Sequence, residues 1–230
     1  MRRRSVIVAA MNQKLYEQRA KRLRDATLVA IFRTRAPEHA VEGMNAAVRG
    51  GFEAVEVTMN TPGATDAIAD VAGRIDAIVG AGTITAPEQV KEAYDAGAEF
   101  IVTPVTIPEI VDAAHELSIP VCMGASTPTE IFRAVQAGAD WVKVFPAESL
   151  GGPDYIRSLL GPLNDTKILV TGGITAENYL GYFDAGVELV GFADSVFDPD
   201  IAADGDYPEL ERRAIEVWRR YDVWESSKRD

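Results

Sequence analysis

Two ionisable residues interrupt apolar runs of the sequence. Glu56 lies in the run AVEVTM, and Lys143 lies in the run DWVKVF. Burying a lone charge is costly, so such residues must be paired, shifted in pKa or functional. A partly desolvated lysine supplies a free amine that can attack a ketone and form a Schiff base. A nearby carboxylate can then move protons between the carbinolamine, the substrate hydroxyl and the enamine carbon, so the pair predicts aldol cleavage or condensation.

The elements that must position these residues are visible as an internal repeat. A glycine followed by an acidic residue and an apolar run occurs four times, beginning at Gly51, Gly97, Gly138 and Gly186. Each glycine is typical of a helix end, and each apolar run is typical of a parallel strand covered on both faces. Between these repeats, apolar runs end in small residues followed by helix starts. Three of these starts have the capping-box pattern, at Thr85-x-x-Glu88, Thr106-x-x-Glu109 and Thr127-x-x-Glu130.

Together with an opening strand at 28–32, these joints predict eight strands. They lie near 28–32, 54–58, 77–81, 100–103, 120–123, 141–145, 167–170 and 189–192. Eight such units without a Gly-x-Gly-x-x-Gly fingerprint predict an α/β fold, a (β/α)8 TIM barrel rather than an open doubly wound sheet. We expect one domain over residues 1–230, with an N-terminal extension and extra helix in 1–27 and the barrel in about 28–223.

Smaller features at the two ends complete this outline. The extra helix is expected from about Asn12 to Asp25, where it could cover the bottom of the barrel. The stretch from Asp198 to Pro208 is expected to be a loop, and the last helix is expected near Leu210 to Val223.

The repeat also predicts where Glu56 and Lys143 meet. Each lies five residues after its repeat glycine. Alternate strands of such a barrel contribute to one interior layer, which would hold Glu56, Val102, Lys143 and Gly191. Both charged residues then lie towards the C-terminal ends of their strands, where barrel enzymes hold their catalytic groups. A structural ion pair that merely fills the layer is the alternative.

Composition limits the classes of partner. The chain has 230 residues, 47% of them hydrophobic, which is sufficient for a large core. A single cysteine, Cys122, and two separated histidines, His39 and His115, exclude an internal disulfide and the usual zinc site, so no metal is expected. A formal charge of -12 disfavours nucleic acid and anionic membranes. No apolar run approaches the roughly 20 residues of a membrane span, so we expect a cytoplasmic protein with a small-molecule partner.

The strand ends carry motifs that resemble a known family. In chain order they are VAIFR, VEVTMNTP, VGAGTIT, FIVTP, GASTPTE, VKVFPAE, TGGIT and ELVGF. These motifs resemble the 2-keto-3-deoxy-6-phosphogluconate aldolases and 4-hydroxy-2-oxoglutarate aldolases, class I enzymes on a (β/α)8 barrel. The resemblance implies reversible cleavage of a 2-keto-4-hydroxy acid to pyruvate and an aldehyde, without cofactor or metal, by a homotrimer.

The resemblance also implies roles for particular residues. Lys143 matches the Schiff-base lysine, and Glu56 matches the proton-transfer residue. Arg33 matches an arginine that contacts substrate oxyanions, with a solvated strand-end arginine as the alternative. Thr83 and Pro104 would line the pyruvate end of the pocket, with ordinary loop and N-cap chemistry as the alternative.

The segment Thr171-Gly172-Gly173 follows the seventh strand. Loops at this position of a barrel commonly cradle a phosphate or carboxylate with backbone N–H groups, so these three residues are expected to bind substrate. A tight turn that binds nothing is the alternative.

Two positions depart from the family pattern. Asn60 stands where the phosphogluconate enzymes typically have an arginine, and VTMNTP is more similar to the 2-keto-3-deoxy-6-phosphogalactonate aldolases. After the eighth strand, Asp194 would repel a substrate phosphate, unless Ser195 takes over by a one-residue shift or Arg33 compensates. Asn60, Asp194 and Ser195 are therefore expected at the substrate, and phosphorylated and unphosphorylated substrates both remain open.

Two other functions fit the same fold. A sugar-phosphate epimerase, or a barrel of tryptophan or thiamine synthesis, would not explain the lysine in VKVFP. A catalytically idle barrel acting as a binding protein or scaffold would not explain two buried charges. Exposure of Trp141, Tyr182 or Phe192 would favour self-association, although aromatic residues at such positions are more often core.

Overall fold

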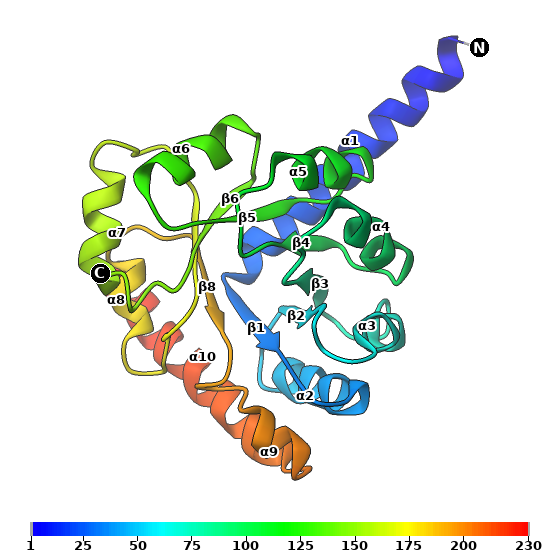
Figure 1. The fold of residues 1–230 in the computed structure, drawn as a ribbon. Helices are drawn as coiled ribbons and strands as arrows, with labels where there is room; N and C mark the ends of the chain where they lie inside the picture. The colour runs from blue at the N-terminus through cyan, green and yellow to red at the C-terminus, as the bar shows by residue number, and fades with distance from the viewer. Residues whose placement is uncertain (1, 230) are drawn as a thin grey trace.

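The computed structural model describes the backbone of residues 2–229 and the side chains of residues 11–228. Eight parallel strands, hydrogen-bonded in chain order, close into a barrel (Figure 1). The strands are β1 Leu28–Phe32, β2 Ala54–Thr58, β3 Ile78–Gly82, β4 Phe100–Val102, β5 Val121–Ala125, β6 Trp141–Val144, β7 Ile168–Val170 and β8 Leu189–Phe192. The predicted TIM barrel is confirmed, and each observed strand begins within one residue of its predicted start.

Helices surround the barrel and connect its strands (Figure 1). They are α1 Arg2–Ala26, α2 Pro37–Arg49, α3 Ala64–Val71, α4 Pro87–Asp95, α5 Pro108–Glu116, α6 Pro128–Gln136, α7 Gly152–Leu160, α8 Tyr179–Phe183, α9 Pro199–Ala203 and α10 Tyr207–Arg229. Three end predictions were wrong: α1 and α10 are longer than expected, and the expected loop at 198–208 contains α9. Asp198 caps α9 by accepting a hydrogen bond from the backbone N–H of Asp200 at 2.8 Å.

Backbone conformation explains the repeat. Gly51, Gly97, Gly138 and Gly186 all have φ between 87° and 104°, which L-residues with a Cβ rarely adopt. A left-handed residue ends the helix and turns the chain into the next strand. The repeat glycines therefore set where the even-numbered strands begin.

Of the three predicted capping boxes, only the one at Thr127 and Glu130 is confirmed. At the start of α4, the side chain of Gln89, not Glu88, accepts the hydrogen bond from the N–H of Thr85, at 2.8 Å. The hydroxyl of Thr106 instead donates to the carbonyl of Gly124 at 2.6 Å.

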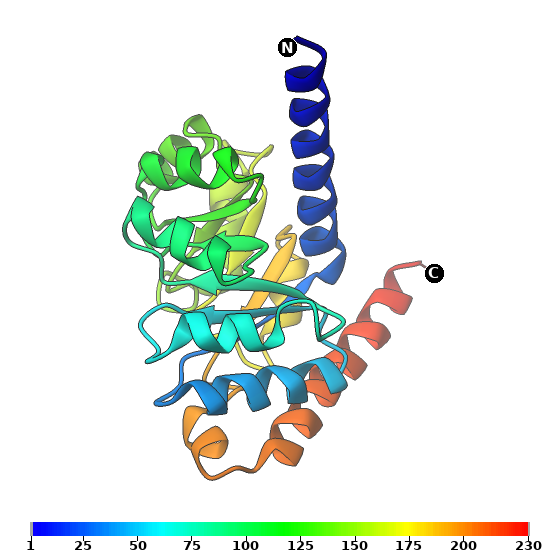
Figure 2. The same ribbon diagram turned by 90° about the vertical axis from the view of Figure 1, so that its right-hand side faces the viewer.

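The C-terminal half of α1 closes the bottom of the barrel. Because α1 leads directly into β1, it meets the barrel where the strands begin, and its first turns project beyond the barrel (Figure 2). Ala20, Leu23 and Ala26 are buried against the apolar side chains of the barrel interior. None of the helices in the described part of the chain has the length and hydropathy that a membrane span requires.

Candidate active site

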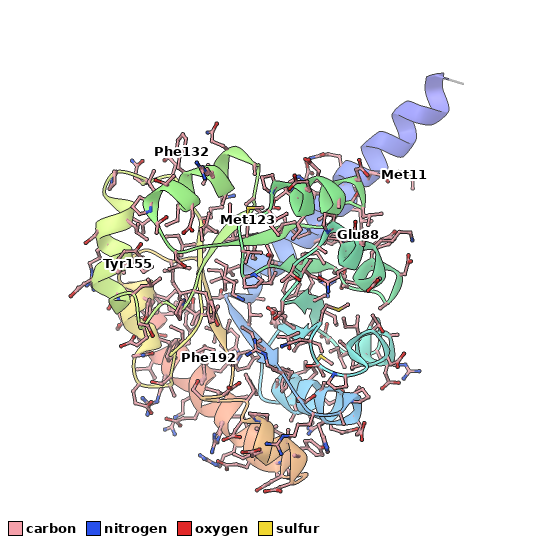
Figure 3. All side chains as sticks on the ribbon, in the orientation of Figure 1. Met11, Glu88, Met123, Phe132, Tyr155 and Phe192 are labelled. Atoms are coloured by element: carbon pink, nitrogen blue, oxygen red, sulfur yellow. The ribbon has the colours of Figure 1, made fainter. Side chains whose placement is uncertain are left out.

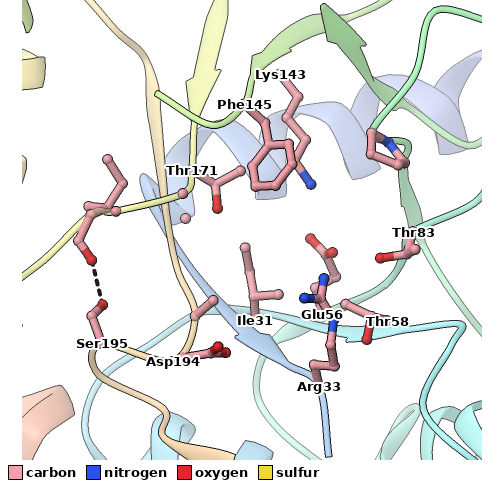
Figure 4. Close-up of a pocket in the computed structure, with 16 residues that line it drawn as sticks. Ile31, Arg33, Glu56, Thr58, Thr83, Lys143, Phe145, Thr171, Asp194 and Ser195 are labelled. Atoms are coloured by element: carbon pink, nitrogen blue, oxygen red, sulfur yellow. Dashed lines mark hydrogen bonds between the residues drawn. The ribbon is translucent and has the colours of Figure 1, made fainter. Parts of the chain in front are cut away.

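A cavity of about 350 Å³ opens at the C-terminal ends of the strands (Figure 4). All but one of the substrate and catalytic residues predicted from the sequence line it. The lining residues are Ile31, Arg33, Glu56, Thr58, Thr83, Pro104, Lys143, Phe145, Thr171, Gly172, Gly173, Ile174, Gly191, Ala193, Asp194 and Ser195.

Glu56 projects from the middle of β2 into this cavity and is completely buried. Gly82 on β3 makes room for it, because a Cβ there would lie 1.6 Å from Glu56 Oε1. Within the described residues, neither carboxylate oxygen of Glu56 has a hydrogen-bond partner. Burial raises the pKa of Glu56 above its ordinary value, although the positive charges of Lys143 and Arg33 oppose that shift.

Lys143 enters the same cavity from β6, on the opposite side, and points towards Glu56 (Figure 4). Its side chain is buried, and its Nζ lies 5.4 Å from the centroid of the Phe145 ring. Burial lowers the pKa of Lys143, and the nearby charge of Arg33 lowers it further, while Glu56 acts in the opposite direction. Burial therefore favours a neutral amine facing a neutral carboxylic acid.

The buried ion pair considered above as a structural alternative is not formed. A direct bond from Lys143 Nζ would give a partner to one of the carboxylate oxygens, yet both lack one in the described residues. A carboxyl and an amine are thus both held out of water and left free for a ligand, an arrangement typical of catalytic groups.

Three residues surround the reacting pair. Arg33 follows β1; its guanidinium is exposed and makes no hydrogen bond or ion pair within the described residues, although its charge acts on both Glu56 and Lys143. Thr83 follows β3 with φ of 57°, a left-handed conformation that is uncommon for a β-branched residue. Pro104 follows β4, and its backbone lies so close to Gly124 that a Cβ there would be 2.1 Å from the Pro104 carbonyl carbon.

The loop after β7 presents backbone N–H groups. Gly172 and Gly173 have φ of 89° and 79°, and within the described residues their N–H groups donate to no acceptor. Asn178 holds the loop by donating to the Gly173 carbonyl at 2.9 Å and to Glu148 Oε2 at 3.2 Å. Tyr182 donates to the same carboxylate oxygen at 2.7 Å, so the loop geometry is fixed from behind.

The loop after β8 contributes Asp194 and Ser195. Asp194 is exposed to the cavity, and within the described residues its carboxylate has no hydrogen-bond or ion-pair partner. The hydroxyl of Ser195 donates to the backbone carbonyl of Ile174 (Figure 4). That bond commits its only proton to the protein.

Asn60 is the predicted site residue that the structure does not bring to the cavity. It is exposed in the turn after β2 and is absent from the lining. Ile174 and Ala193 also line the cavity and were not predicted, and the same is true of Ile31, Thr58 and Phe145. The last three each lie two residues along the chain from a predicted site residue. Strict alternation of inward-facing residues was the signal that could have found them.

Comparison with known proteins gives consistent results. The family model for KDPG and KHG aldolase matches residues 20–213. The 2-dehydro-3-deoxy-6-phosphogalactonate aldolase of Escherichia coli is 37% identical over 174 residues, covering 74% of this chain and 84% of the relative. The KHG/KDPG aldolase of the same organism is 36% identical over 181 residues, covering 78% and 85%.

Solved structures extend the comparison. The KDPG aldolase of Legionella pneumophila, with pyruvate captured as a covalent carbinolamine, has a TM-score of 0.80 at 25% identity and covers 86% of this chain and 97% of that one. A thiamine phosphate pyrophosphorylase from Pyrococcus furiosus, with a TM-score of 0.63 at 19% identity, covers 85% of this chain and 98% of that one, and is similar in fold alone.

Proposed function

The chain belongs to the KDPG and KHG aldolase family of Schiff-base lyases, and we propose that it cleaves a 2-keto-4-hydroxy acid to pyruvate and an aldehyde in the cavity described above, with Lys143 forming the imine. The observation that carries this assignment is that Lys143 and Glu56 form no ion pair with each other or with any other residue that the structure describes. Both are buried in one cavity at the catalytic end of the barrel, and the carboxylate of Glu56 has no partner within the described residues.

The covalent step belongs to Lys143. Its Nζ lone pair attacks C2 of the keto acid, and loss of water from the carbinolamine gives a protonated imine. The imine draws electrons from the C3–C4 bond, which breaks as the C4 hydroxyl loses its proton, so the aldehyde leaves and an enamine remains. Protonation of C3 and hydrolysis then release pyruvate and restore the amine. The lowered pKa of Lys143 favours the neutral amine that this sequence needs.

Glu56 supplies the proton transfers. Burial raises the pKa of Glu56, which favours the protonated carboxyl that gives its proton to the carbinolamine hydroxyl as that group departs as water. The resulting carboxylate takes the proton of the C4 hydroxyl, and later returns it to C3 of the enamine. One group can serve all three steps because no hydrogen bond within the described residues ties its oxygens to one orientation.

The surrounding residues bind and orient the substrate. Arg33 pairs with the carboxylate of the keto acid, while Thr83 and Pro104 line the pyruvate end. Thr171 lines the cavity beside the glycine loop, whose free N–H groups face the aldehyde half. Asn60, Asp194 and Ser195 were expected at the substrate, and of these Asp194 and Ser195 line the cavity.

Trapping of the imine tests the proposal. The protein is incubated with pyruvate and borohydride, and the reduced adduct is located by intact mass and peptide fragmentation. We expect a pyruvyl adduct on Lys143, and Lys143→Arg should remove it. The matched control is Lys167→Arg, because Lys167 is exposed next to Trp141 and does not line the cavity. Absence of an adduct from the parent protein would contradict the mechanism.

A homotrimer in the cytoplasm, expected from the sequence, also belongs to the proposal. Trp141, Tyr182 and Phe192 are buried and offer no surface for self-association. Support comes instead from apolar side chains exposed on and near α6, such as Phe132, which points outward from this helix (Figure 3). The exposed residues in this region are Val105, Phe132, Val135 and Phe145. Light scattering tests the assembly, since Phe132→Asp should shift it towards the monomer.

A further inference from the structure

The end of the cavity formed by the loops after β7 and β8 carries a negative charge. Barrels frequently bind a substrate phosphate with these loops. Here the loop after β8 presents Asp194, whose carboxylate lies on the cavity side, beside Ile31 (Figure 4). No cation among the described residues pairs with it, so it presents a negative charge to whatever occupies this end.

The cations of the cavity cannot compensate for Asp194. Only two lining residues, Lys143 and Arg33, are cationic. Lys143 is consumed by the imine, and Arg33 acts electrostatically on Glu56 and Lys143, at the reacting end. Once Arg33 pairs with the carboxylate of the keto acid, no cation among the described residues that line this cavity remains for a second anion.

Hydrogen-bonding groups at this end match a hydroxyl better than a phosphate. The Ser195 hydroxyl donates its hydrogen bond to the Ile174 carbonyl, so in this arrangement it has no proton left to donate to a ligand. The remaining polar groups are donors, namely the Thr171 hydroxyl and the free N–H groups of Gly172 and Gly173, and the acceptor Asp194. A hydroxyl can accept from the first and donate to the second. A phosphate ester offers acceptors and about -1.5 to -2 charges, so it has no favourable contact with Asp194.

We propose that Asp194 makes this aldolase specific for 2-keto-3-deoxy sugar acids whose distal end carries an uncharged hydroxyl, and that it excludes their phosphorylated counterparts. This inference rests on the proposed function, because it places the imine at Lys143 and the aldehyde half towards β7 and β8. It names the substrate class, which the reacting groups alone leave open.

The test measures pyruvate release from a 2-keto-3-deoxyhexonate and from its 6-phosphate, with both C4 epimers of each. We expect kcat/KM of the parent protein to favour the unphosphorylated acid at least tenfold. Asp194→Ser should shift this ratio towards the phosphate at least tenfold, since it removes the charge and restores a hydroxyl donor. Asp204→Asn is the matched control: Asp204 is exposed outside the cavity, so its loss changes net charge equally and should leave the ratio unchanged.

Ionic strength gives a second readout that a purely structural role would not move. Added salt should reduce the preference of the parent protein for the unphosphorylated acid, because salt screens the repulsion between Asp194 and the substrate phosphate. The preference of Asp194→Ser should stay nearly constant, because this variant lacks the repulsion. A parent protein that prefers the phosphate, or a ratio that Asp194→Ser does not move, overturns the inference.

Borohydride trapping distinguishes failure of this inference from failure of the proposed function. The parent protein and Asp194→Ser are both treated with pyruvate, which has no distal end. An adduct on Lys143 in both proteins, together with an unchanged substrate ratio, refutes the role of Asp194 alone. Absence of the adduct from both refutes the imine mechanism and the inference with it.

Discussion

The two ends of the barrel treat their charged groups in opposite ways. At the bottom, charged side chains that fasten α1 to the barrel make direct contacts: Arg22 donates to both carboxylate oxygens of Glu99 at 2.8 and 2.9 Å. At the mouth, Glu56 and Lys143 are more deeply buried, yet the carboxylate has no partner within the described residues. Satisfied polar groups stabilise the fold, whereas unsatisfied buried ones cost stability and persist where a ligand uses them.

At the bottom of the barrel, Asp140 is the clearest example of a charged group whose hydrogen bonds are satisfied within the protein. Its carboxylate accepts hydrogen bonds from the Tyr16 hydroxyl and from the backbone N–H of Val121, the latter at 2.8 Å. It also lies 3.1 Å from Nε2 of His115. One side chain thus connects α1, α5 and the start of β5. The bottom is therefore expected to contribute stability, and the mouth to contribute chemistry.

The largest expected effect is a loss of activity at the mouth without a loss of stability. Lys143→Ala removes the amine that forms the imine, so turnover should fall by at least ~10⁴-fold. Because Lys143 is buried with a lowered pKa, its loss should not destabilise the fold. Steady-state kinetics and a thermal melt measure both quantities. Substantial aldol activity in this variant would end the imine mechanism.

Glu56→Gln sharpens the comparison because activity and stability should move in opposite directions. Loss of the proton-transfer group should lower kcat by about 10²–10⁴-fold. Replacement of an unpartnered buried carboxyl by an amide of the same shape should raise the free energy of unfolding at pH 7 by about 1 kcal/mol. Kinetics and urea unfolding on the same preparation test this. A variant both inactive and less stable would indicate that Glu56 has a structural role.

Asp140→Asn applies the same change at the bottom, where the opposite result is expected. An amide cannot accept all the bonds that the carboxylate accepts, so loss of these part-buried bonds should cost about 2 kcal/mol of stability. For a chain of this size, that is a fall in Tm of roughly 4–8 °C. The kcat of the folded enzyme should stay within twofold. A selective loss of kcat without a loss of Tm would refute the division between the two ends.

Sequence predicted the fold well because its signals are local. The repeat glycines need a left-handed backbone, and buried parallel strands need continuous apolar runs, so both features are visible in short windows. Glu56 and Lys143 were identifiable for the same reason, as charges inside such runs. The capping prediction at α4 was wrong because Glu88 and Gln89 are adjacent and both can cap, and only the backbone geometry selects Gln89.

Features that depend on where a loop turns could not be predicted. Asn60 and Asp194 both follow strands by a few residues, yet Asp194 lines the cavity and Asn60 does not. Ser195 was expected at the substrate, but the direction of its hydroxyl depends on the Ile174 carbonyl from another loop. Short helices such as α9 arise from a cap and a few contacts, without the periodicity that identifies longer helices.

The smallest expected effect concerns pH, and it tests whether the mouth is destabilised by the charge of Glu56. Burial raises the folded-state pKa of Glu56 above the ordinary 4.5, so at intermediate pH the folded chain holds a proton that the unfolded chain has released. The stability from this group is therefore fully present below about pH 4.5 and is lost as pH rises through the folded pKa.

Glu56→Gln cannot titrate, so its stability relative to the parent protein should be lowest near pH 4.5 and should increase towards pH 8. Each unit of raised pKa corresponds to about 1.4 kcal/mol of this difference. Lys143 contributes the opposite slope: because its pKa is lowered in the folded chain, stability rises with pH until the pH reaches the ordinary pKa of lysine. Comparing the two proteins in a Lys143→Met background removes that contribution. Urea unfolding at pH 4.5, 6 and 8 measures the difference. A difference that does not change with pH in that background would show that Glu56 titrates alike in the folded and unfolded chains, and the contrast between the two ends would then rest on hydrogen bonding alone.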